Sequence, residues 1–196
     1  MTSRRDSIKN SAVATGKGDD GTTGLLFGGR ISKADPRTEA YGTVDEAVAA
    51  LGMARVELTD HGLSDLASLI LRLQRELFVV GAELATNTEH SDRLVDGTTR
   101  VSEQMLESVE ADLGRWESVV TMPREFVIPG ETRSSAALEV ARSVLRRAER
   151  RIVALAASEP IGEWLLPYVN RVADLLWVLA RAAEQAEHVA PTKLHG

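Results

Sequence analysis

Residues 134–158 read SSAALEVARSVLRRAERRIVALAAS and combine an apolar stripe with a dense basic face. Leu138, Leu145 and Ile152 recur every seven residues, with alanines between them at core spacing, which is the pattern of an amphipathic helix. The remaining positions hold five arginines between residues 142 and 151. The stretch therefore predicts one long helix with a buried face and a cationic face.

The same periodicity extends outward from this helix in both directions. It predicts further helices over residues 37–60, 64–86, 102–116 and 166–189. The short apolar run 126–128, stopped by Pro129 and Gly130, predicts a connector or a lone edge strand. Five helices without a convincing strand ladder predict an all-α fold, a five-helix bundle.

Charged residues on these helices are expected away from the core. Asn170, Asp174 and Arg181 fall off the apolar stripe of the last helix. The glutamates on the first two helices are expected in solvated or capping roles, and Ser64 is expected to cap the second helix. They are Glu46, Glu76 and Glu83.

Composition limits the classes of protein that remain. A chain of 196 residues with 43% hydrophobic content suits one domain, which we place at 15–190 between a flexible leader, 1–14, and a tail, 191–196. The lack of Cys excludes disulfides and thiolate metal sites and favours a reducing cytoplasm. The net charge of −6 argues against nucleic-acid binding, and no apolar run reaches membrane length.

A glycine-rich segment, TGKGDDGTTG at 15–24, precedes the first helix. Its glycines let backbone N–H groups approach an anion closely, and its hydroxyls add donors. No strand pattern precedes it as a dinucleotide fold requires, and it lacks the Gly-Lys-Ser/Thr ending of a Walker A loop. It is either a phosphate-binding loop or a flexible linker.

The arginines at 142, 146 and 150 lie one turn apart on a single helix face. A solvated, salt-bridged face is one explanation for such a run. A polyanionic ligand that relieves the repulsion between them is the other, and Lys33 is placed to add charge to the same anion. The four histidines are scattered, so no metal site in the protein is predicted.

Taken together, the segments resemble the PduO-type ATP:cob(I)alamin adenosyltransferases. The glycine-rich segment, EAYGTVDE at 39–46, FVIPG at 126–130, RRAERR at 146–151 and YVNRVAD at 168–174 occur in the family's order. Two positions depart from the family pattern. Lys17 stands where many members have Thr, and Glu131 replaces a second Gly, which raises the question of a positive φ there.

The resemblance implies a homotrimer with ATP and corrinoid sites between subunits, and it assigns roles to individual residues. Asp45 and Arg142 resemble a salt-bridged pair near the corrinoid, and Phe126 the hydrophobic residue below the corrin ring. Arg146 resembles both a catalytic residue and an ATP contact. The other ATP-binding residues it implies are Thr15, Gly16, Lys17, Gly18, Thr23, Gly24, Lys33, Arg147, Glu149, Arg150 and Asn170.

The implied reaction transfers the 5′-deoxyadenosyl group of ATP to the Co(I) of a reduced corrinoid and releases triphosphate, with Mg²⁺ on the phosphates. A reductase and a B12-dependent acceptor enzyme are the further partners that such a reaction calls for. Phe126 is expected either to exclude the lower cobalt ligand or to pack in the core. A non-catalytic, ATP-sensing corrinoid chaperone is the alternative function.

Overall fold

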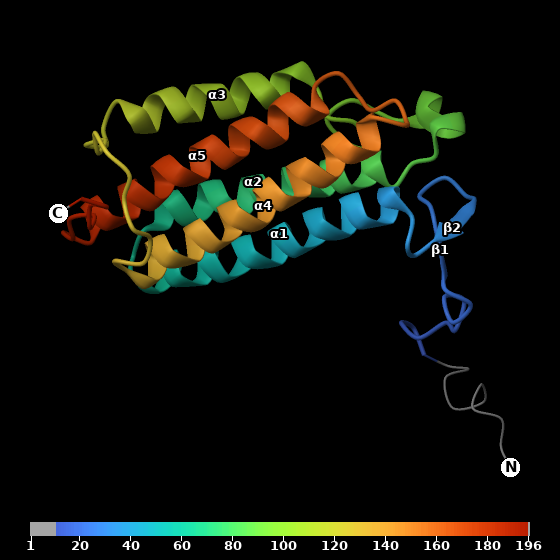
Figure 1. Ribbon diagram of the computed structural model, residues 1–196, viewed down its shortest axis with the longest axis horizontal. Helices are drawn as coiled ribbons and strands as arrows, with labels where there is room; N and C mark the ends of the chain where they lie inside the picture. Colours follow the sequence, from blue (N-terminus) through green and yellow to red (C-terminus); the bar gives the residue numbers. More distant parts are fainter. Residues whose placement is uncertain (1–10, 196) are drawn as a thin grey trace, which may run out of the picture.

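The computed structural model describes residues 11–195 and shows an elongated bundle of long helices (Figure 1). The first ten residues of the expected leader lie outside the described residues, and 11–14 are exposed. The five α-helices are α1 (Pro36–Asp60), α2 (Ser64–Leu84), α3 (Glu103–Glu117), α4 (Arg133–Ala156) and α5 (Leu165–Ala186). The expectation of a mainly helical fold is confirmed.

Helix α1 packs against α2 and α4, while α5 packs against α3 and α4 and fills the centre of the bundle. Leucines dominate the contact surface, and Leu51, Leu73 and Leu145 are fully buried. Helix α4 packs between α1 and α5, with its apolar stripe inward and its arginine face outward. No helix within residues 11–195 is long and apolar enough to cross a membrane.

Side chains cap three of the helices. Asp35 accepts from the N–H of Arg37 at the start of α1, and Ser102 accepts from the N–H of Met105 at the start of α3. At α4, Thr132 and Ser135 form a reciprocal capping box. The expectation for Ser64 was wrong by one residue, because Leu63 is the N-cap of α2 and makes no side-chain cap.

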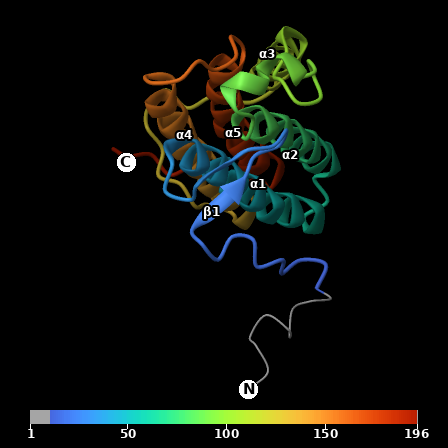
Figure 2. The same cartoon turned by 90° about the vertical axis from the view of Figure 1, so that its right-hand side faces the viewer.

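The glycine-rich region contains strands that the periodicity did not predict. β1 (Thr22–Gly24) pairs antiparallel with β2 (Arg30–Ser32), with Thr23 opposite Ile31. Figure 2 shows this hairpin lying across the end of the bundle. The Leu26 N–H donates to Ala85 O (2.9 Å), which attaches the hairpin to the end of α2. The segment between α2 and α3 contains a short 3₁₀ helix, η2 (Thr88–Arg93).

The connector after α3 pairs with the last residues of the chain. Val127 bridges Lys193, the Ile128 N–H donates to Thr192 O (2.8 Å), and the Leu194 N–H donates to Phe126 O (2.9 Å). Gly130 takes the positive φ of 118°, so Glu131 needs no left-handed conformation. The Glu131 carboxylate accepts from the Thr192 N–H (3.2 Å).

Two expectations about charged residues were wrong. Arg181 is buried, with 2% exposure, because Glu139 and Glu184 supply carboxylates inside the bundle. Glu83 is also buried, because its carboxylate accepts hydrogen bonds from two backbone N–H groups. Glu46 is exposed, as expected, and Glu76 accepts from the Tyr168 hydroxyl (2.6 Å).

Candidate active site

The glycine-rich loop is held in place by two basic side chains. The Lys33 ammonium donates to Gly18 O (2.8 Å), and the Arg30 guanidinium bonds the Lys17 carbonyl and the Thr22 hydroxyl. A Cβ on Gly18 would lie 3.0 Å from Lys33 Nζ and 3.3 Å from Thr22 O. The segment from Gly16 to Gly24 is therefore a shaped loop, and its backbone and the Lys33 ammonium lie side by side.

The arginines of α4 divide into two rows. Arg147 pairs with Glu46 and Arg151 with Glu39 (3.1 Å), so this row is bound to α1. Arg146 and Arg150 form the second row. They are exposed, and within residues 11–195 neither has an acidic partner in ion-pair range. The salt-bridged explanation accounts for the first row and leaves the second available for an anion.

Glu149 and Asn170 lie beside the second row. Asn170 Nδ2 on α5 donates to Glu149 Oε1 on α4 (3.0 Å), so the two predicted ATP contacts meet across neighbouring helices. The Arg150 guanidinium donates back to Arg146 O (3.0 Å). A polar ridge thus follows α4, with hydrogen-bonding groups of α5 along one side.

Phe126 lies on the connector at the other end of α4. Its side chain is 82% exposed, which excludes the core-packing alternative for this chain. It lines a cavity of about 440 Å³ together with Arg142, Glu139, Arg124 and Trp177. An exposed aromatic ring beside a guanidinium and an indole suits a large, flat ligand with polar edges.

Asp45 and Arg142 do not meet within one chain. Asp45 is exposed on α1 and lines a groove toward α2, whose lining is largely apolar and includes Leu26 and Phe78. Arg142 instead pairs with Glu139 (2.7 Å) and faces the Phe126 cavity. The two residues lie on different faces of the bundle.

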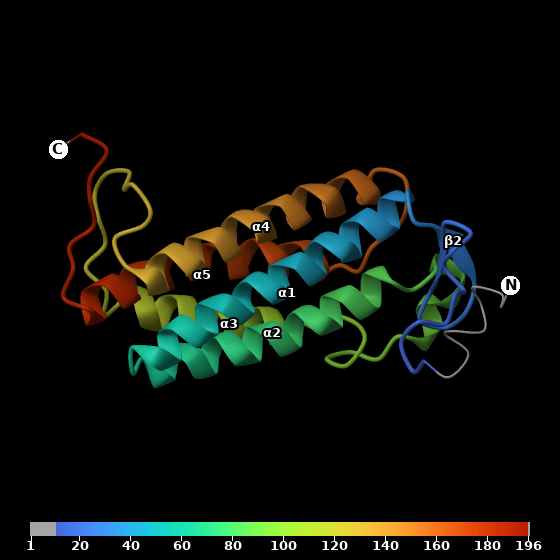
Figure 3. The same cartoon turned by 90° about the horizontal axis from the view of Figure 1, so that it is seen from below.

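The hairpin and the connector lie at opposite ends of the bundle (Figure 3). Helix α4 has 24 residues and spans most of the distance between them, which is about 36 Å at 1.5 Å per residue. This is far longer than an ATP molecule. The glycine loop and Phe126 of one chain are therefore separated by most of the length of the bundle.

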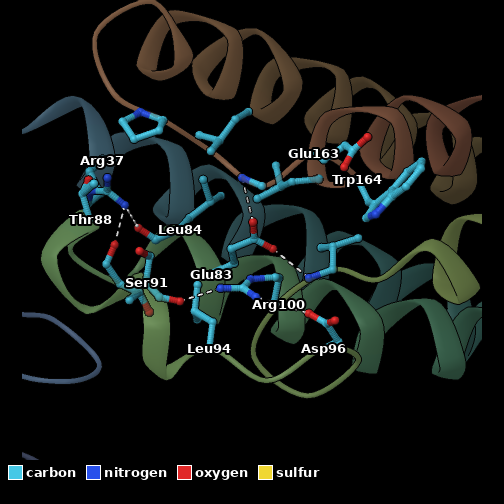
Figure 4. Close-up of a pocket in the computed structure, with 16 residues that line it drawn as sticks. Arg37, Glu83, Leu84, Thr88, Ser91, Leu94, Asp96, Arg100, Glu163 and Trp164 are labelled. Atoms are coloured by element: carbon cyan, nitrogen blue, oxygen red, sulfur yellow. Dashed lines mark hydrogen bonds and ion pairs between the residues drawn. The ribbon is translucent and has the colours of Figure 1, made fainter.

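A further polar cavity of about 450 Å³ lies between the end of α2, η2 and the α4–α5 loop (Figure 4). Glu83 accepts there from the N–H groups of Val101 (2.7 Å) and Gly162 (3.0 Å), and a Cβ on Gly162 would overlap its carboxylate. Burial raises the pKa of Glu83, and these hydrogen bonds oppose the shift only in part. Arg37 bonds Leu84 O and Thr86 O. The Glu83 hydrogen bonds thus hold the α2–α3 segment and the α4–α5 loop against α2, and the Arg37 hydrogen bonds hold the end of α2 against α1.

Sequence reasoning missed several residues that line the Phe126 cavity, among them Arg124, Glu139 and Trp177. Glu139 could have been found, because it precedes Arg142 by three residues and such pairs lie on one helix face. Arg124 and Trp177 carry no comparable signal, since their approach to Phe126 depends on how the connector and α5 pack.

The helical bundle thus carries a polar ridge along α4, a shaped glycine loop and the Phe126 cavity. These features suit a protein that binds a polyanion and a large, flat ligand. Comparison with known proteins agrees. The sequence profile of the cobalamin adenosyltransferase family matches residues 13–183. The corrinoid adenosyltransferase of Bacillus subtilis is 38% identical over 168 residues, covering 85% of this chain and 83% of that protein.

The corrinoid adenosyltransferase PduO of Salmonella typhimurium is 37% identical over 179 residues, covering 91% of this chain and 52% of the longer relative. A solved structure gives the same result. A variant of the PduO-type ATP:corrinoid adenosyltransferase of Lactobacillus reuteri, complexed with cobalamin and ATP, has a TM-score of 0.84 and 31% identity. It covers 93% of this chain and 98% of that chain. The chain belongs to the cobalamin adenosyltransferase family.

Proposed function

We propose that this protein transfers the 5′-deoxyadenosyl group of ATP to the cobalt of a reduced corrinoid. The observation that carries the proposal is the match over nearly the whole chain to a structure that holds both ATP and cobalamin. The cobalt(I) electron pair attacks the ribose C5′, a Co–C bond forms, and the C5′–O bond breaks. Triphosphate leaves with the electrons of that bond.

The residues of this chain orient the substrates and stabilise the charge that develops on triphosphate. We assign that role to Arg146, Arg150, Lys33 and the backbone N–H groups of the 15–24 loop, Thr23 included. Arg147, Glu149 and Asn170 complete the proposed ATP contacts. Mg²⁺ enters with ATP and is held mainly by phosphate oxygens. No attacking side chain is required, because Co(I) is itself the nucleophile.

Phe126 has a separate proposed role. A lower axial ligand donates electron density to cobalt and makes Co(II) harder to reduce. An exposed aromatic side chain in the lower position excludes that ligand and water. The 82% exposure of Phe126 in the single chain supports this role, since the ring is open to a ligand rather than packed in the core.

We propose a homotrimer in which each site is shared between neighbouring subunits. The separation of the glycine loop from Phe126 along α4 supports this arrangement. So do the different faces that Asp45 and Arg142 occupy, because a contact between unlike faces closes into a ring of three when each subunit is turned by a third of a circle from the last. Asp45 of one chain then pairs with Arg142 of the next.

A charge reversal tests this assembly. Asp45→Arg and Arg142→Asp should each yield mainly monomer and little activity. Mixing the two variants should restore part of the trimer and of the activity, because two of the three interfaces in each mixed trimer then pair opposite charges. Light scattering and turnover report both quantities. A monomeric wild-type protein with full activity would rule out the shared site.

Anaerobic turnover separates an enzyme from a chaperone. Incubation with ATP and cob(I)alamin should give the spectral change of Co–C bond formation and one triphosphate per adenosylated corrinoid. Tight ATP binding without either product would support the chaperone. The domain limits 15–190, the reductase and the acceptor enzyme remain predictions.

A further inference from the structure

Arg142 contacts a row of buried charged side chains that have no role in the proposed reaction. Arg142 Nε donates to Glu139 Oε2 (2.7 Å), and Glu139 Oε1 lies 3.4 Å from Arg181 NH2. The same Arg181 nitrogen donates to Glu184 Oε1 (2.8 Å). Two guanidinium groups and two carboxylates thus alternate from the Phe126 cavity into the bundle.

Burial makes this arrangement costly. Glu139, Arg181 and Glu184 are 5%, 2% and 1% exposed, and ion pairs this deep add little stability compared with apolar side chains of the same volume. The network is also incompletely satisfied, since Arg181 Nε and NH1 and Glu184 Oε2 have no hydrogen-bond partner among residues 11–195. Stability alone therefore gives no reason for this set of residues.

The geometry of Arg142 supplies a reason. Only its Nε takes part in the contact with Glu139, and the residues described provide no hydrogen-bond acceptor for its two terminal nitrogens. Its side chain is 24% exposed, whereas that of Glu139 is 6% exposed. Glu139 therefore fixes the guanidinium from the inner side and leaves the terminal nitrogens facing the cavity beside Phe126.

We infer that Glu139 is a positioning residue for Arg142. It sets the direction of the guanidinium that meets the corrinoid edge or the neighbouring subunit, and Arg181 in turn holds Glu139. This inference rests on the proposed corrinoid site. It predicts that Glu139 affects corrinoid binding through Arg142, whereas the ATP contacts on Arg146 and Lys33 do not depend on it.

The test is a double-mutant cycle on the full-length protein. Glu139→Gln keeps the side-chain shape but loses the charge, and it should raise the corrinoid KM about tenfold or more while the ATP KM stays within about twofold. In an Arg142→Ala background the same change should have no further effect on the corrinoid KM. An equal effect in both backgrounds, or an unchanged corrinoid KM in the single variant, overturns the inference.

Glu184→Gln is the matched control, because Glu184 is equally buried and contacts Arg181 but not Arg142. It should lower the melting temperature and leave the corrinoid KM within about twofold. If Glu184→Gln raises the corrinoid KM as much as Glu139→Gln does, the effect is structural and the inference is overturned. If Glu139→Gln does not fold, the neutral pair Glu139→Gln/Arg181→Gln takes its place in the cycle. Wild-type turnover in the same assay tests the proposed function separately.

Discussion

The two ends of the bundle are held in place by different parts of the chain. At the hairpin end, the glycine loop is bound by Arg30 and Lys33, which follow it within a few residues. At the connector end, Phe126 is bound by residues 192–194, more than sixty positions away. The hairpin end presents backbone groups in a fixed arrangement, and the connector end presents the exposed ring of Phe126. We expect the first to serve ATP and the second to serve the corrinoid.

We expect the largest effect from the removal of Arg146, which lies on α4 between the two ends. Arg146→Ala should lower turnover about 10- to 150-fold, because it removes a charge-assisted contact of about 1.5–3 kcal/mol to the leaving triphosphate. The melting temperature should stay unchanged, since the side chain is exposed. Arg151→Ala is the control, because it breaks a surface pair and should keep nearly full activity. Normal turnover of Arg146→Ala would contradict the assignment.

Phe126→Ala should separate the corrinoid end from the ATP end. Starting from cob(II)alamin, activity should fall about tenfold or more, because the lower ligand or water regains access to cobalt. Starting from cob(I)alamin, the loss should be much smaller, and ATP binding should stay intact. A packing residue would instead cost about 3–5 kcal/mol of stability. Equal losses from both cobalt states in a folded variant would end the ligand-exclusion hypothesis.

Lys33→Ala should show a smaller and more local effect. The ATP KM should rise about three- to tenfold through the loss of one cationic contact to phosphate, while the corrinoid KM stays constant. Lys193→Ala serves as the counterpart at the connector end, where Lys193 pairs with Glu125 (3.3 Å). It should leave the ATP KM unchanged. An ATP KM that ignores Lys33 would remove this residue from the site.

The smallest expected effect is the pH dependence that Glu83 gives to the hairpin end. Burial raises its pKa in the folded state above the ordinary value of 4.5. Its contribution to stability is therefore complete below the unfolded pKa and is lost as pH rises through the folded pKa. Urea unfolding should show that the wild type loses stability relative to Glu83→Gln as pH rises above 4.5. A shift in the opposite direction would contradict the direction of the pKa change.

The helices could be predicted closely because apolar spacing over twenty residues is a strong signal. Their observed bounds differ from the expected ones by a few residues at most, as at α5, which ends at Ala186 where 189 was expected. The hairpin could not be predicted in this way. Its strands have three residues each, Thr-Thr-Gly and Arg-Ile-Ser, so they are too short to show alternation.

The candidate site could likewise be predicted only in part. The positions of the α4 arginines follow from helical spacing, but which of them are paired depends on Glu39 and Glu46 of α1, a separate helix. Arg181 was expected off the core for a related reason. A helix face read from one segment does not reveal that a carboxylate of another helix, Glu139, will accompany the charge inside.

The pairing of residues 192–194 with the connector has a practical consequence for the bench. A purification tag placed shortly after Leu194 would lie close to the connector, because the Leu194 N–H donates to Phe126 O. Bulk or charge at that point would pull on the backbone that carries the aromatic ring. Protein for kinetic work is therefore better tagged at the N-terminus, and a C-terminally tagged preparation with weak activity should be cleaved before its rates are interpreted.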